Sequence, residues 1–166
     1  MDTVGGTVED LKPLIGTDEA TIDSKGRILL GKKTRDRLGD NFAMAIGELG
    51  CICAYPELRW KERLKQINRY DSINQGRQQY ERLFFGYADD ELTCDAQGRV
   101  VIPQKLRELG KLKEKVLLVG CNEHLEIWDP AEHRDYGLNP DTYGKERREP
   151  IERAYNKMRE VAPVVP

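Results

Sequence analysis

Apolar residues occur along this chain mostly in short runs of three or four, separated by polar turns. Such runs, bounded by Gly, Pro, Asn or Asp, are typical of short β-strands. The predicted strands are residues 20–22, 28–30, 44–46 and 51–54 in the first half of the chain and 100–102, 116–119 and 125–128 in the second half.

Two of the predicted turns have the same form, Asp-x-x-Gly. The aspartate can accept backbone N–H bonds with its carboxylate, and the glycine can adopt the positive φ that a tight reversal needs. We therefore assign a turn-shaping role to Asp23, Gly26, Asp95 and Gly98.

Apolar stripes with the period of an α-helix lie between the two groups of strands and near the end of the chain. They are Trp60, Leu64 and Ile67 after Pro56; Tyr80, Leu83 and Phe84 within residues 77–85; and Ile151, Ala154, Tyr155, Met158 and Val161. Shorter helices are predicted to start at Pro103, with Leu106 and Leu109 on one face, and at Pro130. We interpret every stripe as core packing and expect no cofactor. Residues 1–13 and 162–166 are predicted to be frayed.

The chain contains an internal duplication. The stretch DSKGRILLGKKTR at 23–35 matches DAQGRVVIPQKLR at 95–107, and residues 21–37 share six identities with residues 93–109. Each half has only short strands and one helical turn, which is too little to bury a core alone. We therefore expect the halves to complete one another by exchanging strands.

The composition describes an ordinary globular protein, with 166 residues, 39% apolar and 34% charged. No apolar run approaches the roughly 18–20 residues of a membrane span, and the N-terminus lacks a secretory signal pattern, so a cytoplasmic location is predicted. The cysteines are Cys51, Cys53, Cys94 and Cys121. They form no C-x-x-C, and neither His124 nor His133 completes a zinc spacing, so buried reduced thiols and no metal are expected.

The net charge of −2 is unevenly distributed. Residues 21–37 carry six cationic and two acidic side chains, and residues 93–109 carry three and two. Both basic segments coincide with the repeated motif, within a more acidic remainder. Basic loci of this kind favour a nucleic-acid partner.

These motifs resemble the MraZ family, transcriptional regulators of the bacterial division and cell-wall gene cluster with two SpoVT-AbrB-type halves. The matching stretches are DSKGR at 23–27, RLFFGYA at 82–88, DAQGRVVIPQKLRELG at 95–110, VLLVG at 116–120 and LEIWD at 125–129.

The resemblance implies an α+β fold in which two swapped-hairpin AbrB-like β-barrel halves form an intrachain pseudo-dimer, with connecting and C-terminal helices. On this basis we expect a first repeat at 14–60, a helical connector at 61–87, a second repeat at 88–135 and a helical tail at 136–166. It also implies double-stranded DNA as the partner, in short direct promoter repeats bound by a homo-oligomeric ring, an octamer, on the nucleoid. Repression is the expected effect.

The candidate DNA-binding residues are the cations of the two motifs. Arginine can hold a phosphate or a guanine edge with two hydrogen bonds, whereas lysine offers a point charge. The set is Lys25, Arg27, Lys33 and Arg35 in the first motif and Arg99, Lys105 and Arg107 in the second. Each motif arginine could instead only pair with the aspartate four residues earlier. Gly31 stands where the family has proline, and Gln97 stands where the first motif has Lys25, so we expect a looser first helix and unequal DNA contacts.

The sequence bears on three other functions. An enzyme is not expected, because the sequence has no Ser-His-Asp set, phosphate loop or metal spacing. The same fold could act as an antitoxin-like module on a protein partner, or as a scaffolding ring without DNA.

Overall fold

The computed structural model describes residues 6–166, except for the side chain of Arg147. The strands are β1 (Thr17–Thr21), β2 (Arg27–Leu29), β3 (Phe42–Ile46), β4 (Ile52–Pro56), β5 (Asp89–Leu92), β6 (Arg99–Val101), β7 (Lys115–Gly120) and β8 (Leu125–Trp128). The α-helices are α1 (Lys32–Leu38), α2 (Glu57–Asn68), α3 (Gln75–Phe84), α4 (Gln104–Leu109), α5 (Pro130–Leu138) and α6 (Lys145–Arg159), and a 3₁₀ turn covers Val8–Asp10.

The two halves of the chain exchange strands. Six antiparallel strands form one sheet in the order β1-β7-β8-β4-β3-β5, and β2 pairs with β6 in a separate ribbon. Strand β1 of the first half thus pairs with β7 of the second, and β5 of the second half pairs with β3 of the first. The α+β fold with an intrachain pseudo-dimer is confirmed. Within residues 6–166 the sheet is open at β1 and β5 and the ribbon covers one of its faces, so the described strands do not close into one continuous barrel.

A pseudo-twofold axis relates the halves. In the ribbon, Ile28 lies opposite Val100, its own duplicate. In the sheet, Cys53 of β4 lies opposite Glu126 of β8. These two are also equivalent positions: they are 73 positions apart, as are the first residues of the helices that follow the two strands, Glu57 of α2 and Pro130 of α5. The axis therefore passes through both central pairs.

Each face of the sheet has its own core. The ribbon-side core contains Ile28 and Val100 from the ribbon and Leu38 and Leu106 from α1 and α4. The helix-side core is aromatic and includes Trp60, Tyr80, Phe84 and Trp128. Alternation along β4 sends successive side chains into the two cores in turn.

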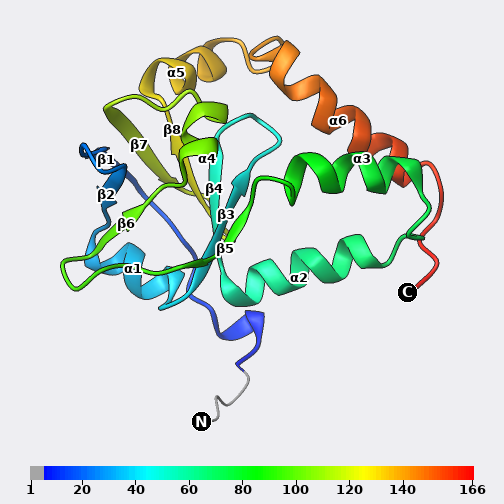
Figure 1. Cartoon of the computed structure of the whole chain (residues 1–166), viewed down its shortest axis with the longest axis horizontal. Helices are drawn as coiled ribbons and strands as arrows, with labels where there is room; N and C mark the ends of the chain where they lie inside the picture. The colour runs from blue at the N-terminus through cyan, green and yellow to red at the C-terminus, as the bar shows by residue number, and fades with distance from the viewer. Residues whose placement is uncertain (1–5) are drawn as a thin grey trace.

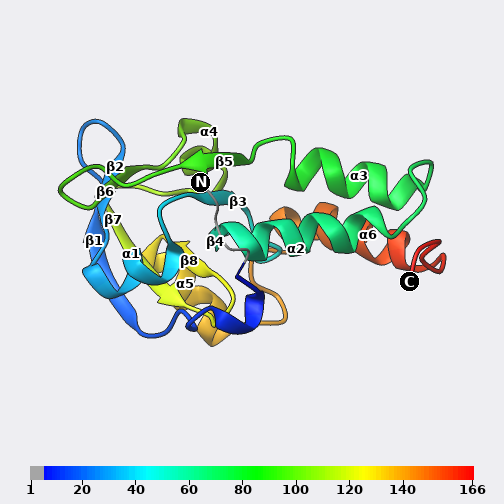
Figure 2. The same cartoon turned by 90° about the horizontal axis from the view of Figure 1, so that it is seen from below.

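The helices α2, α3 and α6 extend away from the sheet at the end opposite to the ribbon (Figures 1 and 2). Helices α3 and α6 pack closely, because Gly76 has no side chain where a Cβ would lie 2.1 Å from the backbone nitrogen of Met158. No helix among residues 6–166 is both long and apolar enough to cross a membrane.

Several local predictions were wrong. Leu109 does not share the buried face of Leu106 and is 37% exposed, because α4 ends there. Val161 lies beyond the end of α6 and is 58% exposed. The C-terminal segment is not frayed, since the backbone nitrogens of Val164 and Val165 donate to the carbonyl of Arg69. Residues 1–5 of the predicted frayed N-terminus lie outside the described residues.

Candidate nucleic-acid interface

The first Asp-x-x-Gly turn is held by one carboxylate. Asp23 Oδ1 accepts hydrogen bonds from the backbone nitrogens of Lys25 and Arg27, both at 2.9 Å. Its other oxygen accepts a hydrogen bond from Arg27 Nε at 2.7 Å. Gly26 has φ of +78°, in the left-handed region that favours glycine. The sequence therefore folds locally into a turn that also fixes the direction of the Arg27 side chain.

The second turn repeats this geometry closely. Asp95 Oδ1 accepts from the backbone nitrogens of Gln97 and Arg99 at 2.9 Å, and Arg99 Nε lies 3.1 Å from Asp95 Oδ2. Gly98 has φ of +85°. The ion pairs considered from the sequence are present in both turns, and each uses Nε, so neither involves the two Nη groups of the arginine.

An arginine from each half of the chain packs against the turn glycine of the other half. A Cβ on Gly26 would lie 2.7 Å from Cζ of Arg107, and a Cβ on Gly98 would lie 2.8 Å from Cζ of Arg35. Each glycine thus gives space to the guanidinium of the opposite half. Arg107 Nε donates to the carbonyl of Ile102 at 2.9 Å, whereas Arg35 Nε is buried and has no hydrogen-bond partner within residues 6–166.

The outer face of the ribbon combines charge with apolar surface. Ile28 and Val100 point into the core, so their neighbours along each strand point outward. Arg27 lies opposite Val101, and Leu29 lies opposite Arg99. Leu29 is 59% exposed and Val101 47% exposed. The sequence contains a signal for this exposed apolar surface, because alternate residues of the strands in ILL and VVI must face opposite sides. From the sequence we interpreted these residues only as aliphatic strand positions.

The seven candidate cations fall into three structural groups. Lys25, Lys33 and Lys105 are exposed. Arg27 and Arg99 are half-buried in the ion pairs of their turns. Arg35 and Arg107 lie against the opposite turn, so they join the two halves as well as contributing charge. Gly31 does not shorten the first helix: α1 has seven residues and α4 has six.

Both turn aspartates are held in the ionised form. The backbone hydrogen bond from Arg27, helped by its side chain, lowers the pKa of Asp23 to about 2. The backbone hydrogen bond from Arg99 likewise lowers the pKa of Asp95. The carboxylates therefore neutralise part of the charge of each motif arginine at neutral pH, and the exposed lysines supply most of the uncompensated positive charge.

The structure also brings together metal-ligand side chains that the sequence spacing did not indicate. Cys51, Cys53 and Glu126 form one such group, and Cys121, His124 and Glu126 form a second. All four cysteines are free thiols; Cys51 and Cys53 are buried, and Cys94 and Cys121 are half-buried. This cluster lies on the helix side of the sheet, away from the ribbon.

Two duplicated halves that exchange strands, with paired basic turns at one end, define a pseudo-dimeric sheet protein of the swapped-hairpin class. A family model described as "MraZ protein, putative antitoxin-like" matches residues 14–83 and again 84–142. The chain belongs to the MraZ family.

Curated relatives agree with this assignment. The chain is 35% identical over 116 residues to a "Transcriptional regulator MraZ" of Roseiflexus sp. (strain RS-1), which covers 70% of this chain and 80% of the relative. It is 33% identical over 122 residues to the protein of the same name from Clostridium acetobutylicum, covering 74% and 85%. With the one from Thermoanaerobacter pseudethanolicus it shares 32% identity over 139 residues, covering 84% and 96%.

Proposed function

We propose that this protein is a transcriptional regulator that binds double-stranded DNA through the β2–β6 ribbon and its two turns. The observation that carries the proposal is the pairing of the turns. The pseudo-twofold axis places two turns of the same geometry, each with an oriented arginine, on either side of the Ile28–Val100 pair. The names of the relatives support the regulatory role.

The chemistry of the ribbon suits a DNA groove. Nε of Arg27 is anchored on Asp23, which directs the guanidinium and leaves its Nη groups for a phosphate or a guanine edge. Leu29 and Val101 offer apolar contacts for thymine methyl groups. The exposed lysines of both motifs supply phosphate contacts that fix position without reading sequence.

We further propose the finer features that the family resemblance implies. These are short direct repeats in a promoter as the target, the division and cell-wall gene cluster as the regulated genes, repression as the effect, and a homo-oligomeric ring, an octamer, in the cytoplasm on the nucleoid. A single subunit offers only two modest basic turns, so repeated subunits on repeated boxes would raise avidity by roughly 10²–10⁴.

The test is a titration of DNA from upstream of the gene, carrying one, two or three candidate boxes, followed by fluorescence anisotropy. Affinity should rise steeply with box number and fall with salt. The Arg27→Ala/Arg99→Ala variant should lose binding. Arg153→Ala removes an exposed cation from α6, at the opposite end of the molecule, and should bind normally.

The second candidate function is neutralisation of a protein partner, which the family description "antitoxin-like" favours. In that case the chain would co-purify with a second protein in a fixed ratio. The wild type would bind DNA only non-specifically, and the Arg27→Ala/Arg99→Ala variant would bind DNA as weakly as the wild type does. Equal affinity for one and three boxes would contradict the ring proposal alone.

A further inference from the structure

Five side chains able to bind a metal converge where two hairpins meet. Cys51 and Cys53 come from the end of the β3–β4 hairpin, and Cys121, His124 and Glu126 come from the end of the β7–β8 hairpin. Cys53 and Glu126 are direct partners across the β4–β8 pair. The cluster therefore lies at the pseudo-twofold axis and joins the two halves of the chain.

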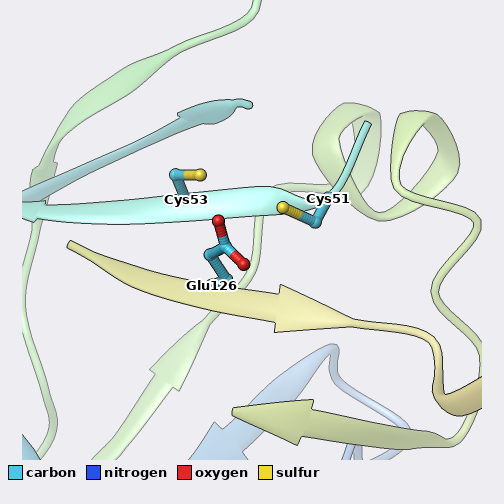
Figure 3. Close-up of side chains that lie close together, drawn as sticks. All are labelled: Cys51, Cys53 and Glu126. Carbon is cyan, nitrogen blue, oxygen red and sulfur yellow. The ribbon is translucent and has the colours of Figure 1, made fainter. Parts of the chain in front are cut away.

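The donor atoms are close enough to share one ion. The sulfurs of Cys51 and Cys53 and a carboxylate oxygen of Glu126 all lie within 4.8 Å of one another. Figure 3 shows the carboxylate of Glu126 directed from β8 toward the neighbouring strand β4, which carries Cys53 and is preceded by Cys51. Ligands of a tetrahedral zinc ion lie about 3.3–3.8 Å apart, given Zn–S and Zn–O bonds of about 2.3 and 2.0 Å. Shifts of about 1 Å or less would bring these three donor atoms to such distances.

A glycine keeps space beside the two sulfurs. A Cβ on Gly47 would lie 2.7 Å from the sulfur of Cys53 and 3.5 Å from the sulfur of Cys51. The backbone nitrogen of Gly47 donates to the carbonyl of Cys51 at 2.8 Å, which holds the hairpin at this distance. Gly47 does not have a positive φ, so the turn itself does not demand glycine there. The sulfurs do.

The second shell already orients the carboxylate. His124 Nε2 lies 3.1 Å from Glu126 Oε2, and Trp128 Nε1 donates to Glu126 Oε1 at 2.8 Å. Such supporting contacts are typical of metal centres.

We propose that this cluster binds one zinc ion per chain through Cys51, Cys53 and Glu126, with a water molecule in the fourth position of the tetrahedron. His124 supports the site by holding the carboxylate of Glu126, and Cys121 belongs to the neighbouring group with His124 and Glu126 rather than to this one. A nucleophilic role for the set Cys53, His124 and Glu126 does not fit, because Cys53 is only 2% exposed and no substrate could reach it. A metal ion, being much smaller than a substrate, can enter this buried site when the hairpin ends open transiently.

The test uses the full-length protein, stripped with a chelator and kept reduced, then titrated with Co²⁺ followed by Zn²⁺. We expect one Co²⁺ per chain with a thiolate charge-transfer band, displaced by Zn²⁺, and a higher midpoint of thermal unfolding with the metal. Cys51→Ser and Cys53→Ser should each weaken Co²⁺ binding by about 100-fold or more. Cys94→Ser is the matched control, because Cys94 packs against the ribbon-side core, and should bind like the wild type.

Two further variants keep the proposal open to refutation. Glu126→Gln retains the size of the side chain and should weaken metal binding. It tests the site even if the serine variants fail to fold, and circular dichroism shows whether each variant is folded. Cys121→Ser should retain the metal; loss of the metal there would overturn the proposed ligand set. If the wild type binds no more Co²⁺ or Zn²⁺ than Glu126→Gln, the site does not exist. DNA binding is measured separately, so failure of either proposal leaves the other intact.

Discussion

The two Asp-x-x-Gly turns have the same backbone but different charge. Each has an aspartate bonded to two backbone nitrogens, a glycine with positive φ and an arginine from the opposite half lying on that glycine. Yet the first turn carries Lys25 where the second carries Gln97. The formal charge of residues 21–37 is +4, whereas that of residues 93–109 is +1. The fold thus constrains the shape of the turns, while their surface has been free to diverge. We expect stability to depend on both turns equally and DNA binding to depend more on the first.

The largest expected effect is on stability. Gly26→Ala and Gly98→Ala each force alanine into the left-handed region and push the guanidinium of the opposite half out of place. Each should lower the free energy of unfolding by about 2–3 kcal/mol, measured by urea denaturation. Gly137→Ala is the control, because that helical position has open space and no positive φ, and it should be neutral or stabilising. A large difference between Gly26→Ala and Gly98→Ala would break the structural equivalence of the turns.

The next effect separates the turns in DNA binding. Arg27→Ala should weaken binding to the upstream DNA by about 10–100-fold, the range of a lost bidentate contact. Arg99→Ala should weaken it less, because fewer cations surround it. Fluorescence anisotropy at fixed salt measures both, with Arg153→Ala as the control. Equal losses in the two variants would contradict the predicted asymmetry, and full affinity in Arg27→Ala would exclude it from the interface.

A smaller effect should follow from making the turns alike. Gln97→Lys gives the second turn the cation of the first and should tighten binding a few-fold at low salt. The plot of log affinity against log salt should steepen by about 0.9 if the new lysine contacts a phosphate. Lys25→Gln should change both quantities in the opposite direction. Unchanged slopes in both variants would place these side chains away from the DNA backbone.

The smallest effect concerns acid. The pKa of Asp23 is lowered to about 2 in the folded protein, so its contribution to stability is complete above its ordinary pKa near 3.8 and is lost as the pH falls toward 2. Asp95 should behave in the same direction. Carboxyl NMR titration would report both values, and Asp23→Asn should remove the dependence at the first turn. A normal pKa for Asp23 in the folded protein would mean that its hydrogen bonds with Arg27 do not persist in solution.

Much of this fold could be read from the sequence, because the duplication and the short apolar runs are local signals. The apolar runs beginning at Ile28 and Val100 indicated short strands, and the aspartate–glycine spacing indicated the turns. The contact of Arg107 with Gly26 could not be read, because it joins residues 81 positions apart across the pseudo-twofold axis. The cysteine cluster was missed for the same reason, since motif spacing describes ligands on one segment, whereas these come from two hairpins. The positions of Leu109 and Val161 were wrong because helix ends depend on packing that periodicity does not report.

The exchange of edge strands also governs how this chain must fold as it is made. Thr17 in β1 pairs with Val119 in β7, about a hundred residues further along. At a synthesis rate of about 5–20 residues per second, β1 waits roughly 5–20 s for its partner. During that interval a neighbouring nascent chain could supply an equivalent β7, so crowded synthesis of this protein should favour intertwined dimers over correctly closed monomers.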